Sequence, residues 1–220
     1  MTRVKICGLT NLDDALAATE AGADLLGFVL VESSPRYLDP GRAAEVVAGL
    51  RQRGVGLPCV GVVAGWALEQ VRALKGQCGF DLVQLHGAAS PATAAALYPG
   101  VIVARQVTGP ASLAGLGAYP AFAYLLDGRG TEGREEKGQP WDWALLRTAR
   151  IPGRVIVAGG LTPENVAQVV RQAWPWGVDV ASGVEARPGR KDRVAVARFI
   201  RTVREVDGGS GSDDGDEALA

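Results

Sequence analysis

The first apolar run of the chain contains two residues, Lys5 and Cys7, whose side chains could do chemistry together. The run Val4-Lys5-Ile6-Cys7 is typical of a short buried strand, and the alternation of side chains along a strand places Lys5 and Cys7 on the same side. An ammonium near a thiol favours the thiolate, which can act as a base. A free cysteine is more often a small apolar core residue, so this segment alone leaves both interpretations open.

Three further residues with chemically useful side chains lie near the ends of other apolar runs. Asp127 follows the very apolar segment 122–126, where partial desolvation would make a carboxyl group a usable proton donor. An aspartate in that place is also a common turn former. Arg36 carries a planar fork that suits a substrate carboxylate, although loop arginines are usually solvated. His86, the single histidine, is a candidate base, but a role in packing or hydrogen bonding fits it better.

Two glycine-bearing turns indicate an anion site late in the chain. Gly159-Gly160 follows one apolar run, and Ser182-Gly183 follows the next. Glycines allow backbone N–H groups to approach a phosphate closely, and a nearby helix start adds a favourable dipole. Ordinary turn chemistry would also explain either pair. Asp179 precedes Ala181 by two residues in the last run, and a buried aspartate there would need a partner or a substrate.

Short apolar runs alternate with helical patterns over most of the chain. We expect strands at residues 3–7, 24–30, 57–63, 81–85, 101–105, 122–126, 154–158 and 178–181. We expect helices at residues 12–21, 40–52, 67–76, 91–97, 111–118, 141–149, 163–173 and 192–205. The clearest helix starts are at Thr10, which Asp13 follows three residues on, and at Thr162-Pro163-Glu164.

This alternation implies parallel strands, because each crossover must be a helix laid on one face of the sheet. Eight such units predict an α/β fold, a single (β/α)8 TIM barrel, and a doubly wound sheet is the structural alternative. Glycine-bearing turns after the seventh and eighth runs, and the lack of a glycine-rich turn after the first, favour the barrel. Chemistry in a barrel is built at the carboxyl ends of the strands. Cys7, His86, Asp127 and both glycine turns are expected there.

Composition excludes several classes of protein. The chain has 220 residues, 47% of them hydrophobic and 21% charged, and a net charge of −1. Residues 207–220 carry five acids and no base, so we expect a disordered, acidic Gly/Ser-rich tail behind a barrel domain at 1–206. The body without this tail has a charge near +4. That balance suits an anionic small molecule but falls short of the basic stripe of a nucleic-acid binder.

Neither a membrane nor a structural metal is expected. No apolar run approaches the roughly 18 residues of a membrane span, and the amino terminus lacks the apolar core of a signal peptide. We therefore expect a cytoplasmic protein. Cys7, Cys59 and Cys78 are widely spaced, without a CxxC pair or a histidine cluster, which argues against a disulfide framework or a zinc site.

The segment Gly128-Arg-Gly130-Thr-Glu-Gly133 matches the G-x-G-x-x-G pattern of dinucleotide-binding turns. That interpretation requires a helix that opens directly from the glycines and an acid about 20 residues further on. Gly138 and Pro140 interrupt any early helix, and residues 147–150 read Arg-Thr-Ala-Arg. We therefore expect no nicotinamide site and interpret residues 128–140 as a long active-site loop.

Six motifs occur in order along the chain: Lys5-Ile-Cys-Gly-Leu-Thr-Asn11, Ser34-Pro-Arg-Tyr37, Val83-Gln-Leu-His-Gly87, Leu125-Leu-Asp127, Ala158-Gly-Gly-Leu-Thr-Pro-Glu-Asn165 and Val178-Asp-Val-Ala-Ser-Gly-Val-Glu185. Together they resemble the phosphoribosylanthranilate isomerase family of tryptophan biosynthesis. The resemblance implies a single-domain (β/α)8 barrel without cofactor or metal. It implies an Amadori rearrangement of N-(5-phosphoribosyl)anthranilate to 1-(2-carboxyphenylamino)-1-deoxyribulose 5-phosphate. The expected partner is thus a phosphorylated small molecule, and we expect a monomer or a homodimer.

The resemblance also implies roles for the catalytic residues. Asp127 would be the general acid that protonates the furanose ring oxygen, so that the ring opens to an iminium ion. Cys7 would be the general base that removes the proton from C2 of the sugar. Lys5 and His86 are expected to act on these groups rather than on the substrate.

The resemblance implies binding residues as well. Arg36 matches the family's ligand for the anthranilate carboxylate, and Asp179 matches a residue on the substrate side of the eighth strand. The backbones of Gly159, Gly160, Ser182 and Gly183 match its phosphate-binding turns.

The sequence departs from the family pattern at three places. Residues 133–143 read Gly-Arg-Glu-Glu-Lys-Gly-Gln-Pro-Trp-Asp-Trp, where family members usually carry Gly-Gly-Thr/Ser-Gly before Phe-Asp-Trp. The altered loop at 133–138 puts substrate affinity and turnover in doubt. Val63-Ala64-Gly65 replaces an apolar residue followed by Asn, and Ala181 stands where serine is common. Cys7 and Asp127 are kept, so loss of activity is not expected.

Two rival functions remain. The barrel isomerase of histidine biosynthesis relies on paired aspartates at the ends of strands 1 and 5, where this chain has Cys7 and Gln106, so it is disfavoured. The other rival is a catalytically silent barrel that binds phosphorylated ligands or serves as an assembly partner. Turnover, as opposed to binding alone, would separate it from the enzyme.

Overall fold

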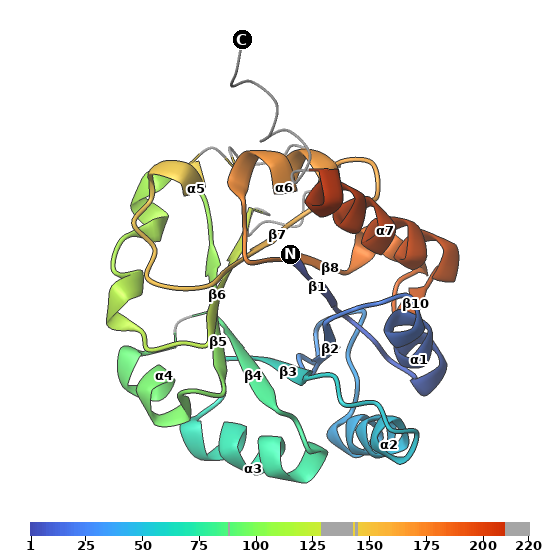
Figure 1. Ribbon diagram of the computed structural model, residues 1–220. Helices are drawn as coiled ribbons and strands as arrows, with labels where there is room; N and C mark the ends of the chain where they lie inside the picture. Colours follow the sequence, from blue (N-terminus) through green and yellow to red (C-terminus); the bar gives the residue numbers. More distant parts are fainter. Residues whose placement is uncertain (88, 129–142, 144, 210–220) are drawn as a thin grey trace.

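The computed structural model describes residues 1–87, 89–128, 143 and 145–209. Eight parallel strands pair in sequence order and close into a barrel, because β1 also pairs with β8 (Figure 1). The closure confirms the (β/α)8 barrel and rules out the doubly wound sheet, which has open edges. The strands are β1 Arg3–Ile6, β2 Leu25–Val29, β3 Cys59–Ala64, β4 Leu82–His86, β5 Val101–Gln106, β6 Ala123–Asp127, β7 Val155–Ala158 and β8 Gly177–Val180.

Helices lie outside the ring of strands, as Figure 1 shows. They are α1 Leu12–Glu20, α2 Pro40–Gln52, α3 Leu68–Cys78, α4 Pro91–Leu97, α5 Leu145–Thr148, α6 Val166–Ala173 and α7 Arg193–Gly209. A short hairpin of β9 (Glu185–Arg187) and β10 (Arg190–Lys191) separates β8 from α7. The hairpin is not expected from the sequence.

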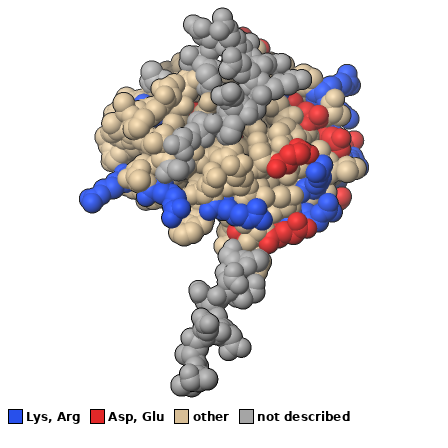
Figure 2. Space-filling view, turned by 90° about the horizontal axis from the view of Figure 1, so that it is seen from above, with Lys and Arg blue, Asp and Glu red and all other residues tan. Residues whose placement is uncertain are grey.

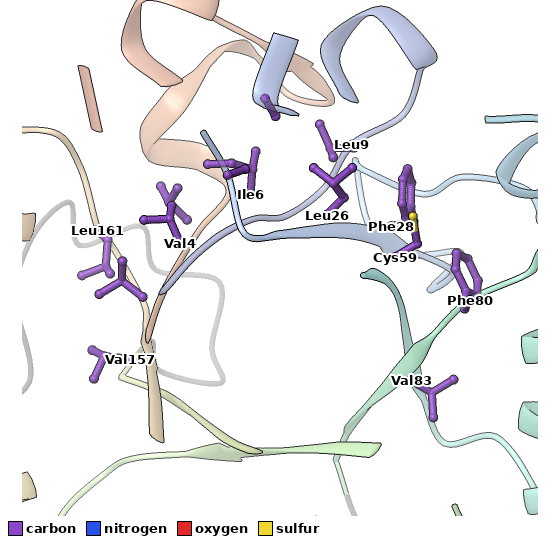
Figure 3. Close-up of a cluster of buried hydrophobic side chains, with 14 of the residues drawn as sticks. Val4, Ile6, Leu9, Leu26, Phe28, Cys59, Phe80, Val83, Val157 and Leu161 are labelled. Atoms are coloured by element: carbon purple, nitrogen blue, oxygen red, sulfur yellow. The ribbon is translucent and has the colours of Figure 1, made fainter. Parts of the chain in front are cut away.

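Two layers of apolar side chains hold the barrel together. One layer fills its interior with residues such as Leu25, Val60 and Ile102. The other lies between the strands and the helices, where Val4, Phe28 and Val83 point away from the barrel axis (Figure 3). Since side chains alternate along a strand, the same short strands supply both layers.

The crossover between β5 and β6 differs from the expected helix at 111–118. It consists of two short 3-10 segments, η1 (Pro110–Leu113) and η2 (Leu116–Ala118). Gly115 between them has a φ of 75°, a left-handed conformation that ends a right-handed helix and that glycine adopts without strain. The predicted helix is therefore interrupted at Gly115, in the middle of the run.

Two predicted helix starts are also corrected. The N-cap of α1 is Asn11, whose side chain accepts a hydrogen bond from the backbone N–H of Asp14; the predicted cap Thr10 instead donates its hydroxyl to the carbonyl of Gly189. Helix α6 begins at Val166, not at residue 163, although Thr162 does accept a hydrogen bond from the N–H of Glu164.

Helix α7 extends four residues beyond its predicted end at 205, to Gly209. Asp207, which the sequence analysis assigns to the tail, lies in this helix and accepts hydrogen bonds from the backbone N–H and the hydroxyl of Thr2, at 2.6 and 2.8 Å. These bonds join the last helix to the amino terminus. Residues 210–220 lie outside the described residues.

The surface over α5, α6 and α7 carries charges of both signs. Figure 2 shows Lys and Arg side chains mixed with Asp and Glu on one side of this face. Helix α7 contributes the pairs Arg198–Glu164 and Arg201–Glu205. Mixed charges of this kind are typical of a solvated helix surface. Within the described residues, no helix is both long enough and apolar enough to span a membrane.

Candidate active site

Inside the barrel, the side chains change from apolar to polar toward the carboxyl ends of the strands. In β4, Leu82 belongs to the inner apolar layer, and Gln84 and His86 follow it at the two-residue spacing that keeps them inside. In β6, Leu125 is followed in the same way by Asp127. The inward-facing polar side chains at this end include Lys5, Cys7, Gln84, His86, Gln106, Asp127 and Asp179.

Lys5 and Asp179 form an ion pair inside the barrel. They are opposite each other in the pairing of β1 with β8, and the Nζ and Oδ1 atoms lie 2.7 Å apart. Burial disfavours the ammonium of Lys5, but the charges of and hydrogen bonds with Asp179 and Cys7 outweigh burial and raise the pKa of Lys5 above its ordinary value. Lys5 therefore stays charged, and Asp179 has a partner within the protein.

Cys7 follows β1 directly and is buried, with 6% of its surface exposed. Burial raises the pKa of the Cys7 thiol; the charge of Lys5 lowers it and the charge of Asp179 raises it. The predicted effect of Lys5 therefore has the expected sign, but burial outweighs it. A thiolate with a raised pKa is a stronger base than an exposed one.

Gly27 in β2 is a residue of the site that the sequence analysis missed. A Cβ at this position would lie 2.9 Å from the Sγ of Cys7 and 3.0 Å from the Nζ of Lys5. Only a residue without a side chain leaves room for both groups here. The sequence signal for it is weak, because a single glycine within an apolar strand is common.

Asp127 is the last residue of β6, three strands from β1 around the barrel. It is partly exposed, and its backbone carbonyl accepts a hydrogen bond from the N–H of Val107 at 2.8 Å. The predicted acid thus lies at the same end of the barrel as Cys7. The loop predicted at 128–140, which includes the glycine-rich pattern and the variant segment 133–138, lies outside the described residues after Gly128.

His86 ends β4 and contacts Gln84, with 2.6 Å between the two Nε2 atoms. Gln84 is buried, and its Oε1 atom has no hydrogen-bond partner among the described residues. This contact fits the hydrogen-bonding role that the sequence favoured for His86. It also identifies Gln84 as a buried polar group that the sequence analysis did not single out.

Arg36 lies in the loop after β2 and forms a bidentate ion pair with Glu185. Nε of Arg36 lies 2.8 Å from Oε1 of Glu185, and Nη2 lies 2.7 Å from Oε2. The stem of Arg36 passes over Gly8, because a Cβ on Gly8 would lie 2.5 Å from the Cδ of Arg36. The guanidinium is therefore held beside the segment that carries Cys7.

The two glycine turns lie next to each other at the ends of β7 and β8. Gly159 and Gly160 have φ values of 96° and 66°, left-handed conformations that turn backbone N–H groups in ways most residues avoid. The Asn165 side chain binds the carbonyl of Gly160 at 3.0 Å. A Cβ on Gly183 would overlap the carbonyl oxygen of Leu161, the residue that follows the turn at Gly159-Gly160. The second turn can therefore pack against the first only with a glycine at position 183.

A separate groove lies at the amino-terminal ends of the strands. Its cavity of about 740 Å³ is lined by residues that include Met1, Arg154, Trp174, Trp176 and Val206. Barrel enzymes carry their chemistry at the opposite end, where Cys7 lies. Among the described residues, no three His, Cys, Asp or Glu side chains form a cluster that could hold a metal ion.

Comparison with known proteins agrees with this geometry. Residues 4–202 match the family described as N-(5'-phosphoribosyl)anthranilate (PRA) isomerase. The N-(5'-phosphoribosyl)anthranilate isomerase of Geobacter sp. strain M21 is 46% identical over 206 residues, which cover 94% of this chain and 100% of the relative.

Two solved structures are similar as well. The phosphoribosyl anthranilate isomerase of Thermotoga maritima has 34% identity and a TM-score of 0.85, covering 93% of this chain and 100% of that one. A phosphoribosyl anthranilate isomerase in complex with reduced 1-(o-carboxyphenylamino)-1-deoxyribulose 5-phosphate has 33% identity, a TM-score of 0.81 and the same coverage. The barrel, the ordered motifs and these matches agree, and the chain belongs to the N-(5'-phosphoribosyl)anthranilate isomerase family.

Proposed function

We propose that the protein isomerises N-(5'-phosphoribosyl)anthranilate to 1-(2-carboxyphenylamino)-1-deoxyribulose 5-phosphate, with Asp127 as general acid and Cys7 as general base. Membership of the isomerase family supports the reaction. The observation that carries the assignment of the residues is their placement. Cys7 and Asp127 lie at the same end of one barrel, after β1 and β6, where barrel enzymes carry out their chemistry.

The reaction begins with two proton transfers, which we assign to Asp127 and Cys7, and ends with a tautomerisation. Asp127 gives a proton to the furanose ring oxygen while the bond from that oxygen to C1 breaks, which leaves an iminium ion between C1 and the anthranilate nitrogen. Cys7, after losing its own proton to solvent, removes the proton from C2 as a thiolate, and the electron pair of that C–H bond neutralises the iminium. The resulting enolamine tautomerises to the ketone, with a proton gained at C1 and one lost from the oxygen on C2.

The surroundings of Cys7 suit this second transfer. A proton on carbon needs a strong base, and burial makes the Cys7 thiolate a stronger base than an exposed one. The ammonium of Lys5, held by Asp179, faces the thiolate and favours its negative charge. In this arrangement Lys5 and Asp179 act through Cys7, while Asp179 is also on the substrate side of β8.

The two charged groups of the substrate are assigned to separate binding residues. The relative whose structure holds a reduced product analogue binds a ligand with a carboxylate and a phosphate. We assign the carboxylate to Arg36, whose pair with Glu185 uses two of the five N–H donors of its guanidinium. We assign the phosphate to the backbone N–H groups of Gly159, Gly160, Ser182 and Gly183, whose two turns lie in contact.

The experiment is a turnover assay with the full chain. The fluorescence of the substrate, generated in situ, is followed after addition of the wild type or of Cys7→Ala, and circular dichroism shows that both proteins are folded. Loss of fluorescence with the wild type and at least a thousandfold slower loss with Cys7→Ala, on the order of losing a catalytic base, is expected. No loss with folded wild type contradicts the proposed reaction.

The oligomeric state stays a prediction of a monomer or a homodimer, and light scattering on the purified protein decides between the two. A higher assembly would contradict both.

A further inference from the structure

We propose that Glu185 and Lys191, on the hairpin after β8, are positioning residues that aim Arg36 at the substrate carboxylate and keep that corner of the site positively charged. The proposal rests on the proposed function, because it needs a carboxylate-bearing substrate. It concerns two residues to which neither the sequence motifs nor the family resemblance gave a role.

The contact with Glu185 fixes the orientation of the Arg36 guanidinium. Both oxygens of the Glu185 carboxylate accept from the guanidinium, at 2.8 and 2.7 Å. A bidentate pair fixes the plane of the guanidinium as well as its position. The Glu185 side chain is only 4% exposed and that of Arg36 17%, so solvent screens this pair much less than a surface pair.

Glu185 is itself fixed from the other side. Its Oε1 atom accepts a hydrogen bond from the Nζ of Lys191 at 3.0 Å and a longer one from the N–H of Gly189 at 3.4 Å. The ammonium of Lys191 also donates to the carbonyl of Ala181, at 3.0 Å. Lys191 thereby ties the carboxylate to the turn that precedes the predicted phosphate-binding pair Ser182-Gly183.

The hairpin is attached to the loop after β1 and to helix α1 as well. The backbone N–H of Lys191 donates to the Asp14 carboxylate at 3.0 Å, and the Thr10 hydroxyl donates to the carbonyl of Gly189. Because Gly8 lies under the Arg36 stem, the guanidinium is held between two segments that are bound to each other. Such support from several elements limits the motion of a long side chain that would otherwise be mobile.

Charge explains why two basic residues are needed. Glu185 alone would cancel the charge of Arg36 and leave a poor site for an anion. Burial lowers the pKa of Lys191, whereas the charge of Glu185 raises it. With a protonated Lys191 the group of three carries a net charge of +1, which favours an anionic ligand. Burial raises the pKa of the Glu185 carboxyl, but Arg36 and Lys191 outweigh burial and lower this pKa below its ordinary value. Glu185 is therefore ionised and binds both cations.

A double-mutant cycle tests the positioning role. KM and kcat are measured for Glu185→Gln, Arg36→Ala and the double variant, with the natural substrate. We expect Glu185→Gln to raise KM about tenfold with kcat within about twofold, the size of one charge-assisted contact. In the Arg36→Ala background the same substitution should change KM by less than about twofold, because Glu185 acts through Arg36.

The sign of the KM change separates positioning from simple charge. Glu185→Gln makes the group more positive, so a residue that only repelled the substrate would lower KM when neutralised. A lower KM, or an equal rise in KM with and without Arg36, overturns the proposal. Glu45→Gln is the matched control, since Glu45 pairs with Arg42 at 2.8 Å on the exposed surface of α2 and should leave KM unchanged.

Lys191 provides a second, independent variant. Lys191→Met should raise KM as Glu185→Gln does, and Lys191→Arg, which keeps the charge, should restore most of the affinity. If Glu185→Gln does not fold, as judged by circular dichroism, this pair decides the question. Folded Lys191→Met with unchanged KM overturns the proposal. An inactive wild type, by contrast, contradicts the proposed function and leaves no KM to compare.

Discussion

The ammonium of Lys5 and the carboxylate of Asp179 lie 2.7 Å apart inside the barrel, on neighbouring strands that come from opposite ends of the chain. No part of the Lys5 side chain is exposed, and that of Asp179 is 11% exposed. The pair thus bridges β1 and β8, whose pairing closes the barrel, and places a fixed positive charge beside Cys7.

Breaking this pair should cost much more stability than breaking a surface pair. We expect Asp179→Asn to lower the free energy of unfolding by about 3–5 kcal/mol, because the charge of Lys5 is left buried without its partner. Glu205→Gln, which breaks the exposed pair with Arg201 on α7, should cost less than about 1 kcal/mol. Urea unfolding of both variants checks the difference, and equal losses would contradict the structural role of Asp179.

The thiol of Cys7 should titrate above the ordinary range. Its pKa is raised from the usual 9.0 because burial outweighs the charge of Lys5. A base must lose its proton to act, so raising the pH from 7 increases the thiolate fraction and, through this group, the rate of C2 proton removal. The difference in thiolate absorbance between the wild type and Cys7→Ala measures this directly. Appreciable thiolate at pH 7 would contradict a raised pKa.

The shared side of Lys5 and Cys7 follows from strand alternation, which a short apolar run reveals in the sequence. The pairing of Lys5 with Asp179 does not, because it depends on the closure of the barrel between strands 174 residues apart. The pair between Arg36 and Glu185 spans 149 residues and depends on a hairpin with no strong local signal. Local sequence patterns thus predict the strands, most of the helices and the end of the barrel that carries the site. The ion-pair partners of Lys5 and Arg36 depend on the tertiary fold and cannot be predicted from such patterns.

Gly27 should not tolerate even one added methyl group. In Gly27→Ala the new Cβ would lie 2.9 Å from the Sγ of Cys7, so the two groups must move apart. We expect a loss of about 1–3 kcal/mol in the free energy of unfolding and a fall in kcat of at least about tenfold, since proton transfer requires close geometry.

The control for this variant is Gly76→Ala. Gly76 lies in α3, is exposed, and has nothing within 4 Å of an added Cβ. This substitution should stabilise the protein by about 0.5–1 kcal/mol through helix propensity and leave kcat unchanged. A Gly27→Ala variant with normal kcat would show that Cys7 does not need its observed position.

The boundary of the folded domain can be tested by truncation. A chain that ends at 209 keeps Asp207 and its two hydrogen bonds to Thr2, at 2.6 and 2.8 Å, whereas a chain that ends at 206, the predicted boundary, loses them. Both bonds are charge-assisted, and the loss of one leaves the backbone N–H of Thr2 in need of a partner. We therefore expect the 1–206 chain to be less stable by about 1–3 kcal/mol.

The 1–209 chain should match the full chain in the free energy of unfolding. The substitution Asp207→Ala in the full chain separates the side chain from the length of the helix, and it should reproduce most of the loss seen in the 1–206 chain. Equal stability of the 1–206 and 1–209 chains would restore the predicted boundary, because the bonds between Asp207 and Thr2 would then contribute nothing measurable to the fold.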